Sequence, residues 1–183
     1  MKWIIIALVV FAVVVALVAL IGARLPRSHR ASVEETLTAA PEAVWQTITD
    51  IDAFPSWREG VKRVQRLPDR DGRPVWVEEG RSGKMTLAVE RLEAPRLLVG
   101  RIADPGLPFG GTWTYEITPA PGGSHLRITE DGEIYNPIFR FMARFVFGYE
   151  STIHSYMASL EKRLTQRPRP ASAKRAGVGP REQ

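Results

Sequence analysis

Cysteine is absent from this chain of 183 residues, and histidine occurs only three times. Without cysteine the chain cannot form a disulfide scaffold, a thiolate metal site or a cysteine nucleophile. His29, His125 and His154 lack the spacing of a zinc site and have no nucleophile partner, so we interpret all three as solvated. A calcium-loop pattern and a glycine-rich phosphate-binding turn are also missing. We therefore predict no metal and no cofactor.

The body of the chain also lacks a basic excess, although the net charge of the whole is +5. Residues 1–30 carry four basic residues and no acid, and residues 166–183 carry five basic residues and one acid. Subtracting the +4 of each end leaves −3 for residues 31–165. A nucleic-acid-binding domain should carry its basic excess on the fold itself, so this distribution argues against a nucleic-acid partner.

The N-terminus contains a long apolar run, the 21 uncharged residues 3–23. As a helix this run would be about 30 Å long, which is enough to cross the hydrocarbon layer, and it would be apolar on every side. A cleaved signal peptide is the alternative, but its apolar region normally has about 7–15 residues and ends at a small-x-small site. We expect a single-pass membrane anchor over residues 1–23 and a linker over residues 24–29. The arginines after the run favour a domain on the cytoplasmic side.

The C-terminal residues 166–183 are rich in proline, alanine, glycine and basic residues. Such a segment buries too little apolar surface to order itself, so we expect a disordered, solvated tail. Electrostatic attachment to anionic lipid headgroups is the alternative role.

Between the two ends, segments with strand periodicity alternate with turns rich in glycine, proline and aspartate. A first strand is predicted around residues 33–37, followed by a short helix from Pro41, because proline suits the first helical position. Six further strands follow, with hairpin turns at residues 68–72 and 121–123 among the breaks between them. The pattern predicts a curved antiparallel sheet of about seven strands.

After the last strand, Asn136 and Pro137 supply an N-cap residue and a first-turn proline. We predict a long helix from there to about Leu164, whose apolar residues share one broad, aromatic face. Gly148 lies in its middle, where it can weaken or kink the helix. A bent sheet that clasps this helix would bury both apolar faces, so the predicted fold class is α+β.

Three segments of the sequence resemble the START-like superfamily, also called SRPBCC, which includes polyketide cyclase/dehydrase-type domains and birch-pollen-allergen-like proteins. The resembling segments are APEAVWQTITDIDAFPSWREGVKRV, GTWTYEI and EIYNPIFRFMARFV. The resemblance spans residues 30–165. It implies a helix-grip fold with a cavity between the sheet and the long helix, which commonly holds lipids, hormones, polyketides or other hydrophobic molecules. Many members of the superfamily are binders or carriers and some are enzymes, but no single catalytic motif runs through it.

Aromatic residues on the strand GTWTYEI and on the long helix are the candidates for lining this cavity, since apolar pockets with a few hydroxyl groups are typical small-molecule sites. The predicted lining residues are Trp113, Tyr115, Met142, Phe145, Tyr149 and Tyr156. Ordinary core packing is the alternative role for all six.

Glu130 is a weaker candidate, for a catalytic role. Strict alternation along its strand points it inward, unless Asp131 and Gly132 form a bulge. A buried carboxylate with a raised pKa can act as a general acid or base. Pairing with an arginine, or a position at the mouth of the cavity, is the alternative.

Taken together, the sequence predicts a membrane-anchored binding or carrier domain for a hydrophobic small molecule, such as a lipid, a quinone or a polyketide-like compound. One alternative is a cyclase or dehydratase that acts on a polyketide-like substrate. The other is a structural or partner-binding module with a filled core.

Overall fold

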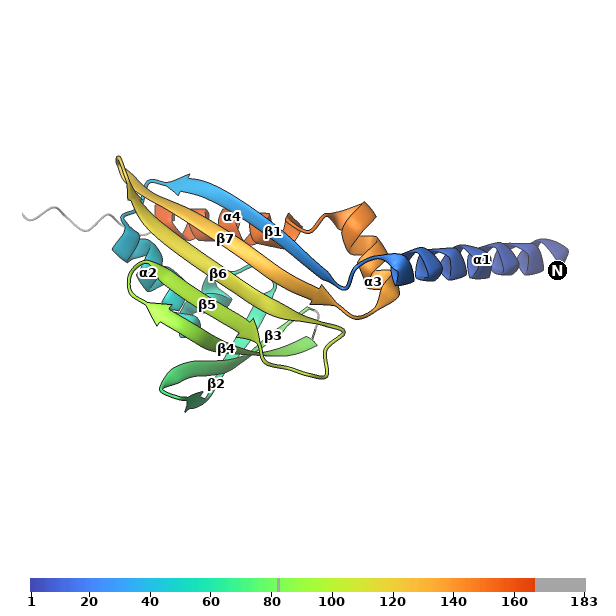
Figure 1. The fold of residues 1–183 in the computed structure, drawn as a ribbon, viewed down its shortest axis with the longest axis horizontal. Coiled ribbons are helices and arrows are strands. Elements are labelled where there is room, and N and C mark those ends of the chain that lie inside the picture. The colour runs from blue at the N-terminus through green and yellow to red at the C-terminus, as the bar shows by residue number, and fades with distance from the viewer. Residues whose placement is uncertain (82, 167–183) are drawn as a thin grey trace, which may run out of the picture.

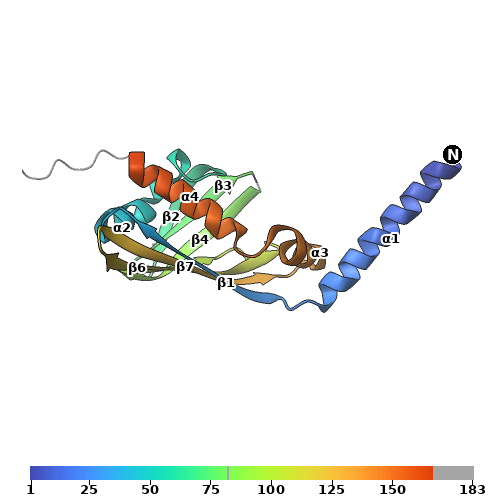
Figure 2. The ribbon, with the colours of Figure 1, turned by 90° about the horizontal axis from the view of Figure 1, so that it is seen from above.

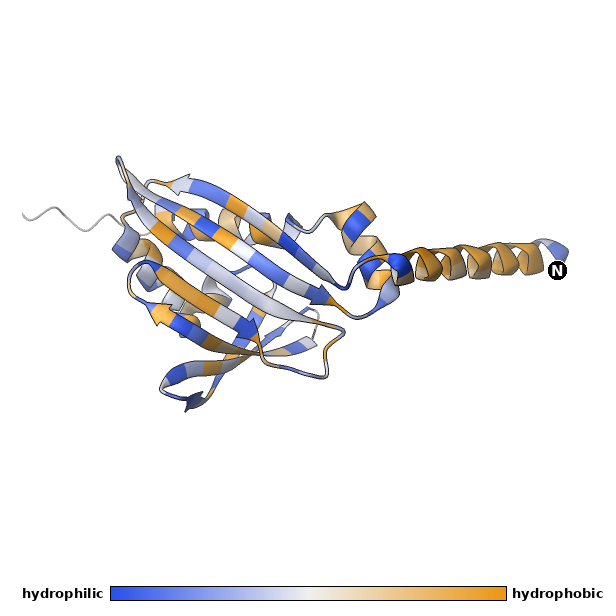
Figure 3. Cartoon of the chain, viewed as in Figure 1, coloured by the Kyte–Doolittle hydropathy of each residue, from blue (hydrophilic) through white to orange (hydrophobic). Residues whose placement is uncertain are grey.

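The N-terminal apolar run forms one helix, α1 (Lys2–Arg24), which projects from the body of the molecule (Figure 1). The computed structural model describes residues 1–81 and 83–166. Hydrophobic residues follow one another along nearly the whole length of α1 (Figure 3), and the helix is long and apolar enough to cross a membrane. The tail predicted over residues 166–183 lies outside the described residues, apart from Gln166.

The body is built on one antiparallel sheet of seven strands in the order β1-β7-β6-β5-β4-β3-β2. The strands are β1 (Ser28–Leu37), β2 (Val61–Arg70), β3 (Arg73–Gly80), β4 (Gly83–Glu93), β5 (Leu97–Ile102), β6 (Phe109–Ala120) and β7 (Gly123–Ile134). From β2 to β7 each strand pairs with the next along the chain, whereas β1 pairs with β7. The predicted number of strands and their antiparallel arrangement are confirmed.

The core lies on one face of this sheet, where period-two alternation places the apolar side chains. Ile117 on β6 and Leu126 and Ile128 on β7 are fully buried there. Two short helices close one end of the sheet, α2 (Pro41–Thr49) and the 3-10 helix η1 (Ile51–Ser56). They bury Val44 and Phe54 against the same core.

The C-terminal helix is shorter than the sequence predicted. Asn136 caps a helix as expected, because its side-chain Oδ1 accepts hydrogen bonds from two backbone N–H groups, but that helix is only α3 (Pro137–Met142). A π-helical turn, η2 (Ala143–Phe147), follows, and Gly148 then adopts a φ of 77°, which ends helical geometry. The prediction of one continuous helix to Leu164 is therefore wrong. The helix that packs on the sheet is α4 (Ser151–Gln166), as Figure 2 shows.

Candidate ligand cavity

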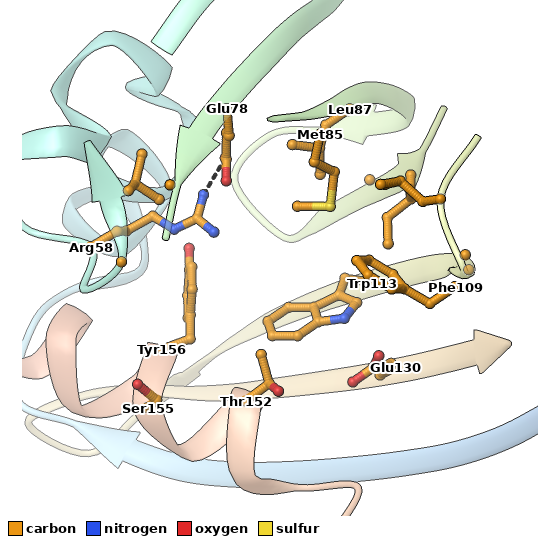
Figure 4. Close-up of a pocket in the computed structure, with 18 of the residues that line it drawn as sticks. Arg58, Glu78, Met85, Leu87, Phe109, Trp113, Glu130, Thr152, Ser155 and Tyr156 are labelled. Carbon is orange, nitrogen blue, oxygen red and sulfur yellow. Dashed lines mark hydrogen bonds and ion pairs between the residues drawn. The ribbon is translucent and has the colours of Figure 1, made fainter. Parts of the chain in front are cut away.

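A cavity of about 720 Å³ lies between the inner face of the sheet and α4 (Figure 4). Small-molecule sites typically have volumes of about 300–1,000 Å³, so this space is the size of a ligand site. Its lining is mostly apolar and includes Trp76, Leu87, Val89, Leu98, Ile102 and Trp113. The interior of the domain therefore contains a ligand-sized space. In a structural module with a filled core, side chains would occupy that space.

Five of the six predicted lining residues face this cavity. Trp113 and Tyr115 reach it from β6, Met142 from α3, and Tyr149 and Tyr156 from the segment after Gly148. The ring centroid of Tyr156 lies 5.8 Å from that of Trp113 and 5.6 Å from that of Tyr115, so the three rings form one aromatic wall.

Phe145 is the predicted residue that does not line the cavity. It lies in η2 and is 58% exposed. A π-helical turn has a wider hydrogen-bond spacing than an α-helix, so the 100° step that placed Phe145 on the inner face does not apply to it.

The phenol groups of Tyr115 and Tyr156 remain protonated at physiological pH. Burial raises the pKa of Tyr115 to about 12 and raises the pKa of Tyr156 well above 10. Their hydroxyl groups are thus neutral hydrogen-bonding groups on an apolar wall and add no charge to the cavity.

A buried ion pair, which the sequence reasoning missed, borders the same cavity. The guanidinium of Arg58 donates a hydrogen bond to the carboxylate of Glu78 (Figure 4). Nε1 of Trp76 donates a second one to the same carboxylate over 3.0 Å. The guanidinium carbon also lies 4.7 Å from the ring centroid of Phe54 and 5.2 Å from that of Tyr156. These partners satisfy both charges within the protein.

Glu130 and His29 form a second polar group, on the opposite side of Trp113 from Arg58 (Figure 4 shows Glu130). The pairing of β7 is continuous through Asp131 and Gly132, so no bulge intervenes and Glu130 lies inward, where it lines the cavity. Oε1 of Glu130 lies 3.9 Å from Nε2 of His29. Burial raises the pKa of Glu130 and lowers the pKa of His29, so the uncharged form of each is favoured.

The prediction that His29 is solvated is wrong. Its side chain is 10% exposed, and its ring stacks on Tyr149 at a centroid distance of 4.2 Å. A Cβ at Gly132, its pairing partner on β7, would lie 2.4 Å from the ring, so the missing side chain of Gly132 makes room for it. Side chains alternate between the two faces along β1, and Ala31 and Val33 are buried, so the same alternation indicates that His29 also points inward.

Replacing Glu130 with glutamine tests the burial of this carboxyl group. Because its folded-state pKa lies above the ordinary value of 4.5, the wild-type protein loses stability as the pH rises from that value through the folded pKa. The Glu130→Gln variant lacks this loss and should be more stable than wild type at pH 7, but equally stable below pH ~4. Thermal unfolding in detergent, followed by circular dichroism across this range, measures the difference. Parallel pH profiles for the two proteins would contradict the prediction.

A metal site is not apparent, since the described residues contain no group of three histidine, aspartate or glutamate side chains placed to hold an ion. The polar groups that line the cavity include the phenols of Tyr115 and Tyr156, the Glu130–His29 pair, and the hydroxyl groups of Thr152 and Ser155 (Figure 4).

A family model described as "Polyketide cyclase / dehydrase and lipid transport" matches residues 28–165. No curated protein matches the chain in sequence. Among solved structures, the chain is similar to the Zhui aromatase/cyclase from Streptomyces sp. R1128, with 13% identity and a TM-score of 0.63 over 79% of this chain and 98% of that one. It is also similar to a START superfamily protein from Mycobacterium smegmatis, with 19% identity and a TM-score of 0.60 over 77% and 99%.

A third similar structure is the di-domain ARO/CYC BexL from the BE-7585A biosynthetic pathway, with 10% identity and a TM-score of 0.64. The match covers 81% of this chain and 53% of BexL, so the chain spans about half the length of that di-domain protein. At these identities the structural likenesses show a shared fold and nothing finer.

Proposed function

The chain belongs to the polyketide cyclase/dehydrase and lipid transport family, and on that premise we propose that it is a membrane-anchored binding or carrier domain for a hydrophobic small molecule. The START-like resemblance of the sequence and the predicted fold class are confirmed by this match and by the solved neighbours. The observation that carries the proposal is the cavity of about 720 Å³ with its mainly apolar lining.

Binding in such a cavity is driven by the removal of apolar guest surface from water, which contributes about 25 cal/mol per Å². The aromatic wall of Trp113, Tyr115 and Tyr156 supplies the contact surface. The Arg58–Glu78 pair is already satisfied, so it needs no charged group from the ligand. A neutral, mostly apolar guest with a hydroxyl or carbonyl group fits this lining best.

The second candidate function is catalysis of the cyclase or dehydratase type on a polyketide-like substrate. It is favoured by the pairing of Glu130 with His29 inside the cavity, because two titratable groups with oppositely shifted pKa values suit general acid–base chemistry. If this function holds, Glu130→Gln should lower the turnover of the bound compound by about 10²-fold or more. Unchanged turnover would leave binding as the function.

Anchoring rests on α1, which we propose to be a retained transmembrane helix and not a cleaved signal peptide. Three arginines between residues 24 and 30 support a cytoplasmic position of the domain, because the positive-inside rule favours basic flanks on that side. Tethering would keep the cavity at the surface of the bilayer, where hydrophobic molecules partition. Because the chain has no cysteine, labelling one engineered cysteine in the domain of intact cells tests the orientation.

Untargeted mass spectrometry of the protein purified from its native membrane tests ligand binding directly. We expect a hydrophobic compound to co-purify at a fixed ratio with the protein. It should be absent from a matched preparation of the Gly100→Phe variant, in which the added ring occupies the cavity. The proposal fails if nothing co-purifies and if no lipid, quinone or polyketide-like compound displaces a hydrophobic dye from the protein.

A further inference from the structure

The base of α1 packs against α3 (Figures 1 and 2). The body is therefore joined to α1 by direct contacts as well as by the connecting residues. A Cβ at Gly22 would lie 1.9 Å from the carbonyl oxygen of Pro137, so the two backbones are in direct contact. Nη1 of Arg140, a buried residue, donates a hydrogen bond over 2.7 Å to the carbonyl oxygen of Leu25. These contacts fix α3 beside the last turn of α1.

Directly after this contact, the chain exposes an unusual amount of apolar surface. Five large apolar side chains within residues 138–147 are exposed, with Phe147 the most exposed at 63%. We call this set the apolar rim, and it consists of Ile138, Phe139, Phe145, Val146 and Phe147. No described part of the chain covers it. Apolar patches of this kind on a protein surface mark contacts with another apolar phase or partner.

The apolar rim also borders the mouth of the cavity. Phe139 and Phe147 are exposed and yet line the cavity, so the cavity reaches the surface at the rim. The end of β3 and the start of β4 form another part of the lining, with Arg81 and Lys84, and both views show these strand ends on the side of the body that faces α1 (Figures 1 and 2).

Basic side chains accompany the rim. Arg81 and Lys84 at the mouth, Arg24 at the base of α1 and Arg144 within η2 are all exposed. None of the four forms an ion pair with a carboxylate of the described residues. Aromatic side chains and cations gathered at one level beside an apolar helix are the composition that an interfacial layer with anionic headgroups attracts.

We propose that the apolar rim lies in the interfacial layer of the membrane crossed by α1, so that the cavity opens onto the bilayer and takes its guest directly from lipid. This inference rests on the proposed anchoring and adds to it a docking surface and a route for the guest. The partner is a lipid surface and not a second copy of the chain, since the rim continues the apolar surface of α1 at its base.

A depth measurement tests the docking without any ligand. Val146 belongs to the rim and does not line the cavity, and the chain has no cysteine, so Val146→Cys carries a unique spin label. The full chain is reconstituted in nanodiscs of phosphatidylcholine and phosphatidylglycerol. We expect the label to collide more with oxygen than with a water-soluble nickel chelate. The matched control is Leu92→Cys on β4, a residue that is 46% exposed, where the nickel chelate should dominate.

Two outcomes would overturn the docking. A Val146 label as accessible to nickel as the Leu92 label would show that the rim faces water. A Val146 label shielded from both oxygen and nickel would show that another protein copy covers it. Neither outcome depends on ligand binding, so the docking is judged separately from the proposed function.

A charge placed on the rim tests the route. Val146→Asp should slow the transfer of a pyrene-labelled fatty acid from anionic vesicles to the reconstituted protein at least tenfold, and leave the affinity for the same probe in detergent unchanged, because the cavity lining is intact. Leu92→Asp should change neither quantity. Equal transfer rates for Val146→Asp and wild type would overturn the route.

Discussion

Replacing Gly100 with phenylalanine should lower the affinity for the hydrophobic guest on the order of 100-fold. Gly100 lines the cavity from β5, between Val89 and Trp113, which are its pairing partners and also face inward. A Cβ at this position would meet no atom within 4 Å, and its φ lies outside the left-handed region, so a side chain fits without strain. The ring then displaces guest surface whose burial is worth about 2–3 kcal/mol.

The neighbouring position supplies the control for this variant. Arg101 has its side chain on the opposite, solvent-facing side of β5, and its ion pair with Glu90 is exposed. Arg101→Phe therefore adds the same ring outside the cavity and should leave the affinity for a fluorescent hydrophobic probe unchanged. If Gly100→Phe is folded by circular dichroism and binds the probe as tightly as wild type, the cavity is not the binding site.

The sheet was predictable because its residues repeat a local rule. Trp113, Tyr115 and Ile117 alternate with polar residues, and glycine and proline turns separate one strand from the next. Each strand pairs with its sequence neighbour, apart from β1, so local signals sufficed to order most of the sheet. The pairing of β1 with β7 depends on closure of the whole domain and has no local signal.

The broken C-terminal helix was missed for a physical reason. Residues 138–147 are as apolar as the face of α4, and periodicity does not distinguish an apolar surface that contacts a core from one that is exposed. Gly148 was recognised as a weak point of the helix, but the π-helical turn before it and its positive φ of 77° were not predicted. The exposure of Phe145 follows from that same turn.

The polar groups of the cavity include a contact that the sequence alone could not predict. Glu78 shares a strand face with Trp76, and this parity signals that it points inward. Its partner Arg58 lies 20 residues earlier, just after η1, and no periodicity connects the two. The inward position of a charged residue can therefore be predicted from the sequence, whereas the residue that compensates its charge cannot.

Replacing Glu78 with alanine should destabilise the protein by about 3–5 kcal/mol, because removal of one partner leaves a buried charge without compensation. Glu78 is only 5% exposed, and its carboxylate accepts hydrogen bonds from both Arg58 and Trp76. A loss of this size is a large part of the stability of an ordinary domain, which is about 5–15 kcal/mol. Urea unfolding of the detergent-solubilised full chain, followed by near-ultraviolet circular dichroism, measures it.

Two further variants separate the lost charge partner from a general effect of mutation. Glu34→Ala removes the partner of Arg127 in an ion pair whose side chains are both about half exposed, and it should cost less than ~1 kcal/mol. The double variant Arg58→Met, Glu78→Leu removes both buried charges and keeps apolar volume, so it should recover most of the stability that Glu78→Ala loses. If Glu78→Ala costs no more than Glu34→Ala, water reaches Arg58 and compensates its charge. The inner end of the cavity would then be wet, and the case for a mostly apolar guest would fail with it.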